Sequence, residues 1–160
     1  MMKTKYLALI SLFLLLSACS APKYEYLQLN IEEGFNPSEV QLAEIVFKSG
    51  ERPIEVEIIS FTNEYHNKKW SHEKIIDGNE NTSWANGDAF DGKYPHQFVF
   101  KLKQISSLDS VEIYTGTQDG KKYRLSSFSI YGSSNQKEWT KLMSGKLDKD
   151  TPNAWKKYEI

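Results

Sequence analysis

Cysteine occurs only once in the 160 residues, at Cys19, so a disulfide within the chain is excluded. Long apolar runs are also scarce. One run, Leu7–Leu16, follows Lys3 and Lys5, and it is shorter than the roughly 20 residues that a membrane-spanning helix needs. After this run a single domain of about 140 residues remains. That domain must be stabilised by a buried apolar core, helped at most by a bound metal.

An excess of basic charge is missing as well. The chain has 20 basic and 21 acidic residues, and without Lys3 and Lys5 the balance is 18 to 21. We therefore expect no nucleic-acid partner. Catalytic patterns are absent too, since there is no Gly-x-Ser-x-Gly, no His-Glu-x-x-His and no metal-ligand spacing among the three histidines. Paired carboxylates would allow glycoside hydrolysis, but nothing in the sequence brings a pair together, so we expect that the protein is not an enzyme.

The N-terminus has the order of a secretory signal: basic residues, an apolar run and small residues. Leu16-Ser17-Ala18-Cys19 resembles the bacterial lipobox, in which the cysteine becomes the lipidated first residue. We expect a signal peptide at 1–18 and a lipid anchor such as palmitate on Cys19. The lipid would be the only membrane contact of a cell-envelope protein, at the outer membrane if the host is Gram-negative. The alternative is an ordinary signal peptide with a chance cysteine. Residues 19–38 are polar and mixed, which suggests a tether, with an early strand suggested at Tyr24–Ile31.

Short strands dominate the rest of the sequence. Apolar and polar residues alternate in segments separated by Gly- and Asn-containing turns. These segments are Val40–Phe47, Ile54–Ile59, Gln97–Leu102, Val111–Tyr114, Phe128–Tyr131, Glu138–Met143 and Trp155–Ile160. No amphipathic helix is evident, beyond a helical turn at Lys74–Asp77. The pattern predicts an all-β, antiparallel sandwich. The interval from Thr62 to Pro95 has little regular structure but holds two tryptophans and two of the three histidines, so we expect functional loops there.

A run of oxygen-bearing side chains follows Ile76. Asp77-Gly78-Asn79-Glu80-Asn81-Thr82 combines a turn that tolerates positive φ with carboxylate, amide and hydroxyl oxygens, which suit Ca²⁺. An EF-hand is excluded because Thr82 stands where its glycine belongs, Asp88 replaces its bidentate glutamate, and neither flank is helical. The alternative is a structural Asp-Gly turn without metal.

Several segments together resemble the F5/8 type C (discoidin-like) domain, which overlaps carbohydrate-binding module family 32. They are Glu73–Trp84, Gln97–Leu102, Val111–Gly116 and Tyr123–Leu142, with the motifs Asp-Gly-x-x-x-Thr-x-Trp and Phe-x-Ile-x-x-Ser-x-Asn. Gln136 departs from the pattern, which commonly has glycine there. The resemblance implies a galactose-binding-like jelly roll, which we place at residues 39–160.

The resemblance also implies one structural Ca²⁺. Asp77 and Thr82 match the family's ligands, with backbone carbonyls of Lys74, Asn79 and Thr82 as further donors. The family's usual C-terminal glutamate is missing, and we expect Glu44 in Ala43-Glu44-Ile45-Val46-Phe47 to take its place by a circular rearrangement. The alternative for Glu44 is a solvent-facing side chain on an edge strand.

The same resemblance implies a ligand site in loops at one end of the sandwich. Sugars stack on aromatic rings and pair their hydroxyl groups with polar side chains. The candidates for carbohydrate contact are Tyr65, His66, Trp70, Tyr94, His96, Asp119 and Lys121. For each aromatic residue the alternative is packing beneath a loop, and we expect this role for Trp84 and Trp139. A glycan is thus the expected ligand, and docking of an envelope protein through the same loops is the alternative.

Overall fold

The structure is a computed structural model that describes residues 21–86 and 93–160. Residues 1–18, predicted above to be a signal peptide, and Cys19 and Asp88 lie outside the described residues. The strands are β1 (Tyr24–Gly34), β2 (Gln41–Leu42), β3 (Glu44–Ser49), β4 (Arg52–Pro53), β5 (Val56–Phe61), β6 (Trp84–Ala85), β7 (His96–Ser106), β8 (Ser110–Tyr114), β9 (Leu125–Ser133), β10 (Thr140–Lys146) and β11 (Trp155–Glu159). Three short 3-10 helices complete the described elements: η1 (Lys68–Trp70), η2 (His72–Ile75) and η3 (Lys121–Tyr123).

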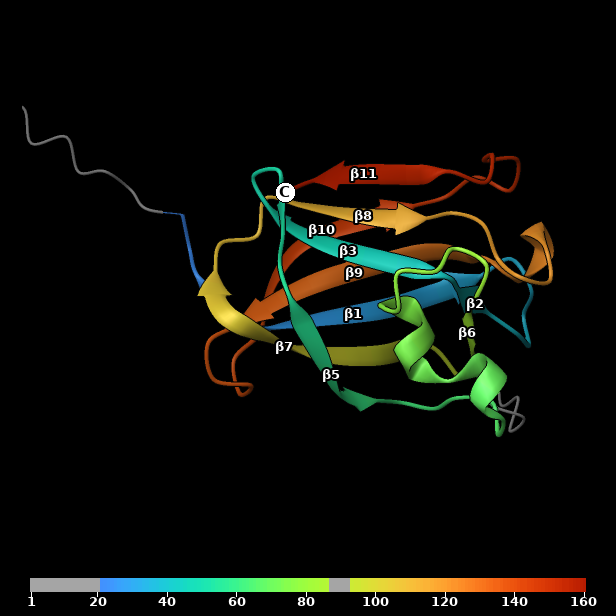
Figure 1. Cartoon of the computed structure of the whole chain (residues 1–160), viewed down its shortest axis with the longest axis horizontal. Coiled ribbons are helices and arrows are strands. Elements are labelled where there is room, and N and C mark those ends of the chain that lie inside the picture. Colours follow the sequence, from blue (N-terminus) through green and yellow to red (C-terminus); the bar gives the residue numbers. More distant parts are fainter. Residues whose placement is uncertain (1–20, 87–92) are drawn as a thin grey trace, which may run out of the picture.

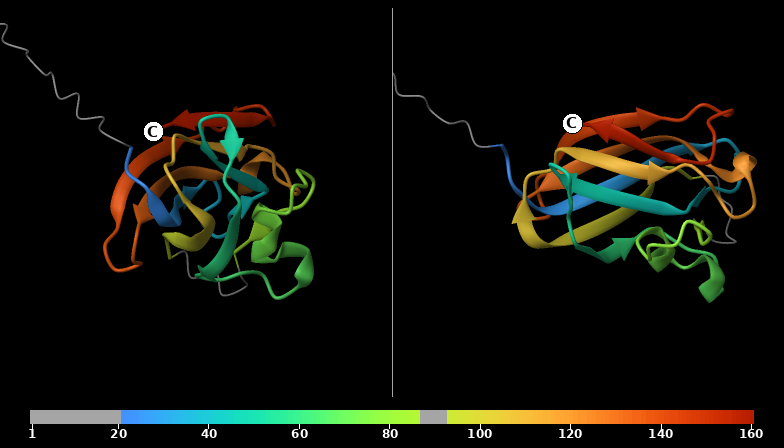
Figure 2. Two further views of the ribbon diagram at one scale, coloured as in Figure 1. Left: turned by 60° about the vertical axis from the view of Figure 1, so that its left-hand side comes forward. Right: turned by 45° about the horizontal axis from the view of Figure 1, so that its top comes forward.

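The strands form two facing antiparallel sheets (Figures 1 and 2). The larger sheet has the order β10-β9-β1-β7-β5, the smaller one has the order β11-β8-β3-β4, and β2 pairs separately with β6. Every pairing of named strands is antiparallel. The predicted all-β antiparallel sandwich is therefore confirmed.

Alternating side chains of both sheets build the core. In β7, Phe98, Phe100 and Leu102 are buried while Gln97, Lys101 and Lys103 are exposed, as the alternation predicted. The facing strand β3 contributes Phe47, whose ring lies 4.9 Å from that of Phe100 in an edge-to-face arrangement. Burial of such side chains at about 25 cal/mol per Å² is the main stabilising term in a domain without disulfides.

The tether predicted for residues 19–38 is wrong for most of its length, whereas the strand suggested at Tyr24–Ile31 is confirmed as part of β1. Tyr24–Gly34 is β1, which pairs with β7 on one side and β9 on the other, in the middle of the larger sheet. Leu27, Leu29 and Ile31 are each 0% exposed. The folded domain thus begins at Tyr24 rather than at residue 39, because its central strand lies in the segment that looked polar and mixed. The predicted strand Val40–Phe47 is also divided, since β2 pairs with β6 and β3 pairs with β8.

Backbone conformation explains how a turn tolerates Gln136. The residue has φ of 60°, the left-handed region that favours glycine, so the chain keeps the turn that the expected glycine would form. Neighbouring side chains hold it in place: Ser133 Oγ accepts from Gln136 N at 3.0 Å, and Asn135 Oδ1 accepts from Lys137 N at 2.9 Å. Gly50, Gly78 and Gly120 also have positive φ, at three of the turns that the sequence predicted.

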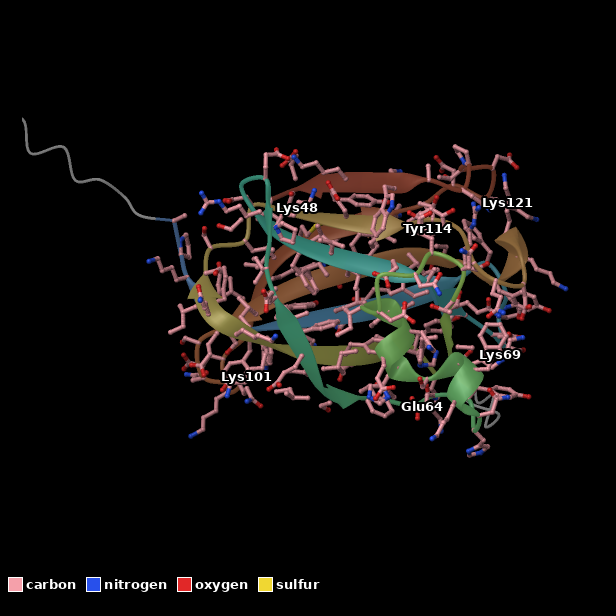
Figure 3. All side chains as sticks on the ribbon, viewed as in Figure 1. Lys48, Glu64, Lys69, Lys101, Tyr114 and Lys121 are labelled. Atoms are coloured by element: carbon pink, nitrogen blue, oxygen red, sulfur yellow. The ribbon has the colours of Figure 1, made fainter. Side chains whose placement is uncertain are left out.

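The two ends of the sandwich differ in character. The chain enters β1 and leaves β11 at one end, whereas β2, β6 and the three 3-10 helices gather at the other, which we call the loop end (Figures 1 and 2). Tyr114 and Lys121 lie toward the loop end, while Lys101 lies toward the opposite end (Figure 3). None of the helices among the described residues has the length and apolar character needed to span a membrane.

Candidate functional site: a polar turn and the loop end

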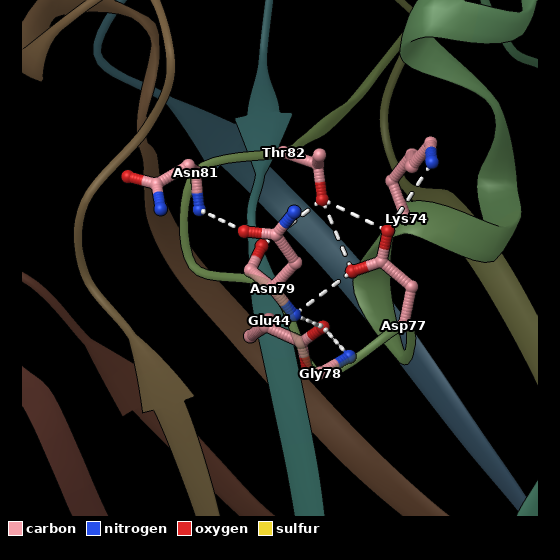
Figure 4. A network of polar contacts seen from close by, with 7 residues as sticks. All are labelled: Glu44, Lys74, Asp77, Gly78, Asn79, Asn81 and Thr82. Carbon is pink, nitrogen blue, oxygen red and sulfur yellow. Dashed lines mark hydrogen bonds and ion pairs between the residues drawn. The ribbon is translucent and has the colours of Figure 1, made fainter.

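The Asp-Gly motif forms a compact turn directly after η2. We call Asp77–Thr82 the polar turn (Figure 4). Asp77 Oδ1 accepts from Asn79 N at 3.0 Å, and Gly78 has φ of 75°, which a side chain would disfavour. The Thr82 hydroxyl lies 3.0 Å from both Asp77 carboxylate oxygens and 3.0 Å from the Asn79 carbonyl oxygen. The residues that matched the family's metal ligands are therefore gathered by local hydrogen bonds.

Glu44 approaches the polar turn from β3, more than 30 residues earlier in the chain. Its Oε1 accepts from Gly78 N at 2.7 Å and from Asn79 N at 3.3 Å (Figure 4). Glu44 is only 3% exposed, so the alternative of a solvent-facing side chain is wrong. The pKa of Glu44 is raised to about 7, chiefly by burial and also by the neighbouring Asp77 carboxyl, against the lowering effect of the Gly78 and Asn79 amides.

The chemistry of this donor set fits a hard cation. Glu44 and Asp77 bring two carboxylates to one place, and Thr82 and Asn79 add hydroxyl and carbonyl oxygens. The described residues contain no group of three or more His, Cys, Asp or Glu side chains that would hold a metal ion. Neutral oxygens would have to complete the shell, which suits Ca²⁺ better than a transition metal. Lys74, predicted as a carbonyl donor, places its ammonium group 3.2 Å from Asp77 Oδ2.

Two loops meet at the loop end through Gln41, a residue that the sequence analysis did not single out. Its side chain is 1% exposed and donates to Asp119 Oδ2 at 3.0 Å, while its Oε1 accepts from Asp119 N at 3.4 Å. Ser83, which follows the polar turn, accepts from Gln118 N at 3.2 Å. The Thr117–Lys121 loop is thus fixed against β2 and the segment after the polar turn. No short-range pattern indicates these contacts.

The seven predicted carbohydrate contacts divide by burial. His66, Asp119 and Lys121 are exposed and Tyr65 is half-buried. His96 is 1% exposed, with ring centroids of Tyr94 and Trp84 at 4.9 and 5.7 Å, so its prediction as a ligand contact is wrong.

The two other aromatic candidates differ in burial. Trp70 is 8% exposed with the Lys69 ammonium 4.5 Å above its ring, so the packing alternative holds for it. Tyr94 is half-buried against the core and stays a candidate. Trp84 packs in the core, as predicted, at 0% exposure.

Arg124 is a second residue that the sequence analysis missed. Its guanidinium is buried near the loop end, where it donates to the Thr151 carbonyl and to Asn153 Oδ1. These contacts fix the loop that leads into β11. The loop end is therefore a hydrogen-bonded frame that carries a few exposed polar groups.

Comparison with known proteins gives one family. The model of the F5/8 type C domain matches residues 58–160, which is more than half of the chain. Neither the curated proteins nor the solved structures include a significant match. Members of this family are generally binding modules rather than catalysts, and they commonly bind carbohydrate or protein partners. The matched region includes the polar turn, β6 and the three 3-10 helices of the loop end, but not β2 or Glu44. The chain belongs to the F5/8 type C domain family.

Proposed function

We propose that the protein is a lipid-anchored lipoprotein of the cell envelope that binds carbohydrate at its loop end and is stabilised by a structural Ca²⁺. The observation that carries this proposal is the family membership, together with a hydrogen-bonded loop end that exposes polar side chains. The proposed anchor at Cys19 precedes β1, and β1 begins at the end of the sandwich opposite the loop end (Figure 1). An anchored molecule would therefore present the loop end away from the membrane.

Exposed groups at the loop end provide the proposed contacts. Asp119 accepts and Lys121 donates hydrogen bonds, and His66 and the half-buried Tyr65 lie on the segment after β5. Backbone contacts restrain both segments, because Tyr65 N donates to Ala85 O at 3.0 Å and Asp119 is held by Gln41. Groups held in place lose little conformational entropy when they bind a ligand, which favours recognition of small polar molecules such as sugars.

A glycan array followed by titration calorimetry tests the proposal. We expect binding of the full chain, held in a detergent without a sugar headgroup, to one class of glycan. The Lys121→Ala variant should bind it about tenfold more weakly, because a charge-assisted hydrogen bond is lost. Lys101→Ala is the matched control, since this exposed lysine lies at the opposite end (Figure 3). No glycan binding, with recovery of one envelope protein instead, would replace the proposal by a docking role.

Calcium removal gives a separate prediction. Calcium at about thirty times its Kd should stabilise the native state by about 2 kcal/mol and raise Tm by about 4–8 °C relative to EDTA. Asp77→Asn should abolish this difference, because it removes one of two carboxylates while preserving size. Asp119→Asn, a change of the same kind in the neighbouring loop, should retain it. Differential scanning calorimetry measures both, and identical curves in calcium and EDTA would leave the polar turn as a structural element only.

A further inference from the structure

Trp155 differs from the other tryptophans in its exposure. It is 40% exposed on β11, whereas Trp84 and Trp70 are buried, at 0% and 8% exposure, and Trp139 is half-buried. On β11 the exposed residues alternate with partly buried ones, and Tyr158 packs its ring against Phe128 in the core. Trp155 therefore points to the outer face of the smaller sheet.

Cross-strand pairing places Trp155 at the loop-end edge of that face. Trp155 pairs with Tyr114 of β8, and Tyr114 pairs with Glu44 of β3, so the three residues form one row across the sheet. The polar turn covers the Glu44 end of the row, which is why this outward-facing carboxylate is buried. Trp155 and part of Tyr114 remain accessible at the other end of the row.

Both rings are held in a fixed geometry. The centroids of Trp155 and Tyr114 are 5.7 Å apart with an interplanar angle of 59°. A Cβ atom at Gly116 would lie 2.5 Å from the Tyr114 ring, so the glycine allows this ring to lie against the backbone. Trp155 Nε1 donates to Glu80 Oε1 at 2.6 Å, which links β11 to the polar turn 75 residues earlier. We call Trp155, Tyr114 and Glu80 the Trp155 platform.

The charges around the Trp155 platform determine whether a neutral or an acidic ligand is favoured. Neighbouring acidic groups are compensated, as Glu112 pairs with Lys48 at 2.7 Å and Asp77 with Lys74 at 3.2 Å. Within the part of the chain that the structure describes, Glu80 makes no ion pair, and its one hydrogen bond is to Trp155. Its second oxygen is thus able to accept from a hydroxyl group. An uncompensated carboxylate repels acidic ligands such as sialylated or sulfated glycans.

We propose that the Trp155 platform is a second carbohydrate subsite, which binds a neutral pyranose. The C–H face of the sugar stacks on the indole, and a sugar hydroxyl donates to Glu80. This inference rests on the proposed function, but it places a ligand on a sheet face rather than in the loops. One tryptophan beside charged side chains is too small and too polar for the core of a stable protein interface, whereas it matches the size of one sugar ring.

Titration calorimetry of the full chain, in a detergent without a sugar headgroup, tests the subsite. The probes are lactose, N-acetyllactosamine and cellotetraose, with sialyllactose as the acidic comparator. We expect a neutral probe to bind and to shift the tryptophan emission. Trp155→Ala should raise the Kd of the neutral probe at least about tenfold and abolish the shift in tryptophan emission. Trp155→Phe should retain part of the affinity. Glu80→Gln should retain the affinity for the neutral probe and increase the affinity for sialyllactose, because the repelling negative charge is removed.

The outcomes separate the subsite from the proposed function. If Trp155→Ala leaves the glycan affinity unchanged while Lys121→Ala lowers it, the subsite is overturned and the loop end remains the carbohydrate site. Tighter binding of sialyllactose than of lactose by the wild-type protein would overturn the preference for neutral sugars. Failure of the wild-type protein to bind any glycan would overturn both proposals. Unfolding curves of each variant, which should match that of the wild type within about 1 kcal/mol, show whether a loss of binding reflects a loss of fold.

Discussion

Replacing Trp84 by alanine is expected to lower the free energy of unfolding by about 3–5 kcal/mol. Trp84 closes the Asp-Gly-x-x-x-Thr-x-Trp motif, is 0% exposed and packs edge-to-face on Phe98 at 4.8 Å. Its Nε1 also donates to the Asn63 carbonyl at 2.9 Å, which attaches the segment after β5 to β6. Truncation would leave a large cavity and an unpaired carbonyl, so a large part of the stability of a domain of this size would be lost.

Trp155→Ala is the matched control for this prediction, because it removes the same side chain from the surface. We expect it to cost less than about 1 kcal/mol, since 40% of the residue is already exposed to solvent. Trp84→Phe should lie between the two, because it keeps an aromatic ring but loses the hydrogen bond to Asn63. Urea unfolding followed by circular dichroism gives the three values. Equal losses for Trp84→Ala and Trp155→Ala would contradict a central role of the motif tryptophan in the core.

Local pattern was sufficient to predict the strands that show a clean alternation. In β7, Phe98 and Phe100 point inward and Lys101 outward, because a period of two exposes alternate side chains whatever the neighbouring strand is. The polar turn was predictable because it is also a local feature: Asp77 and Thr82, which are joined by hydrogen bonds, lie only five residues apart. Structural features that depend only on residues close in the sequence can therefore be predicted from short segments.

Features fixed by distant pairing were harder to predict. The central place of β1 depends on Leu29 lying opposite Phe98 on one side and Ile130 on the other, and neither partner is near it in the sequence. Polar residues on the opposite face of β1 made the same segment resemble a tether. The contacts of Gln41 with Asp119 and of Glu80 with Trp155 likewise join residues more than 70 positions apart. Glu44 was found only because its surroundings resembled a family pattern, not because of its spacing from Asp77.

Glu44 leads to the second large expected effect, a dependence of stability on pH in the calcium-free protein. Its pKa is about 7 in the folded state, because of burial and the nearby Asp77 carboxyl, against a value of 4.5 when it is unperturbed. The folded state therefore binds more protons than the unfolded state between these two values. The stabilising contribution is fully present below about pH 4.5 and is lost as the pH rises through about 7, by up to about 3 kcal/mol.

Calcium should reverse the sign of this dependence. A cation at the polar turn needs ionised carboxylates, so the stabilisation by calcium should grow over the same pH range in which the calcium-free protein loses stability. Urea unfolding at about pH 5 and about pH 8, in EDTA and in calcium, measures the two effects. Glu44→Gln should remove most of the pH dependence in EDTA, and its difference from the wild type isolates the contribution of this carboxyl group. If the variant and the wild type show the same slope in EDTA, the proton is not held by Glu44. The order of the polar turn then rests on the hydrogen bonds of Gly78, Asn79 and Thr82, without a proton on Glu44.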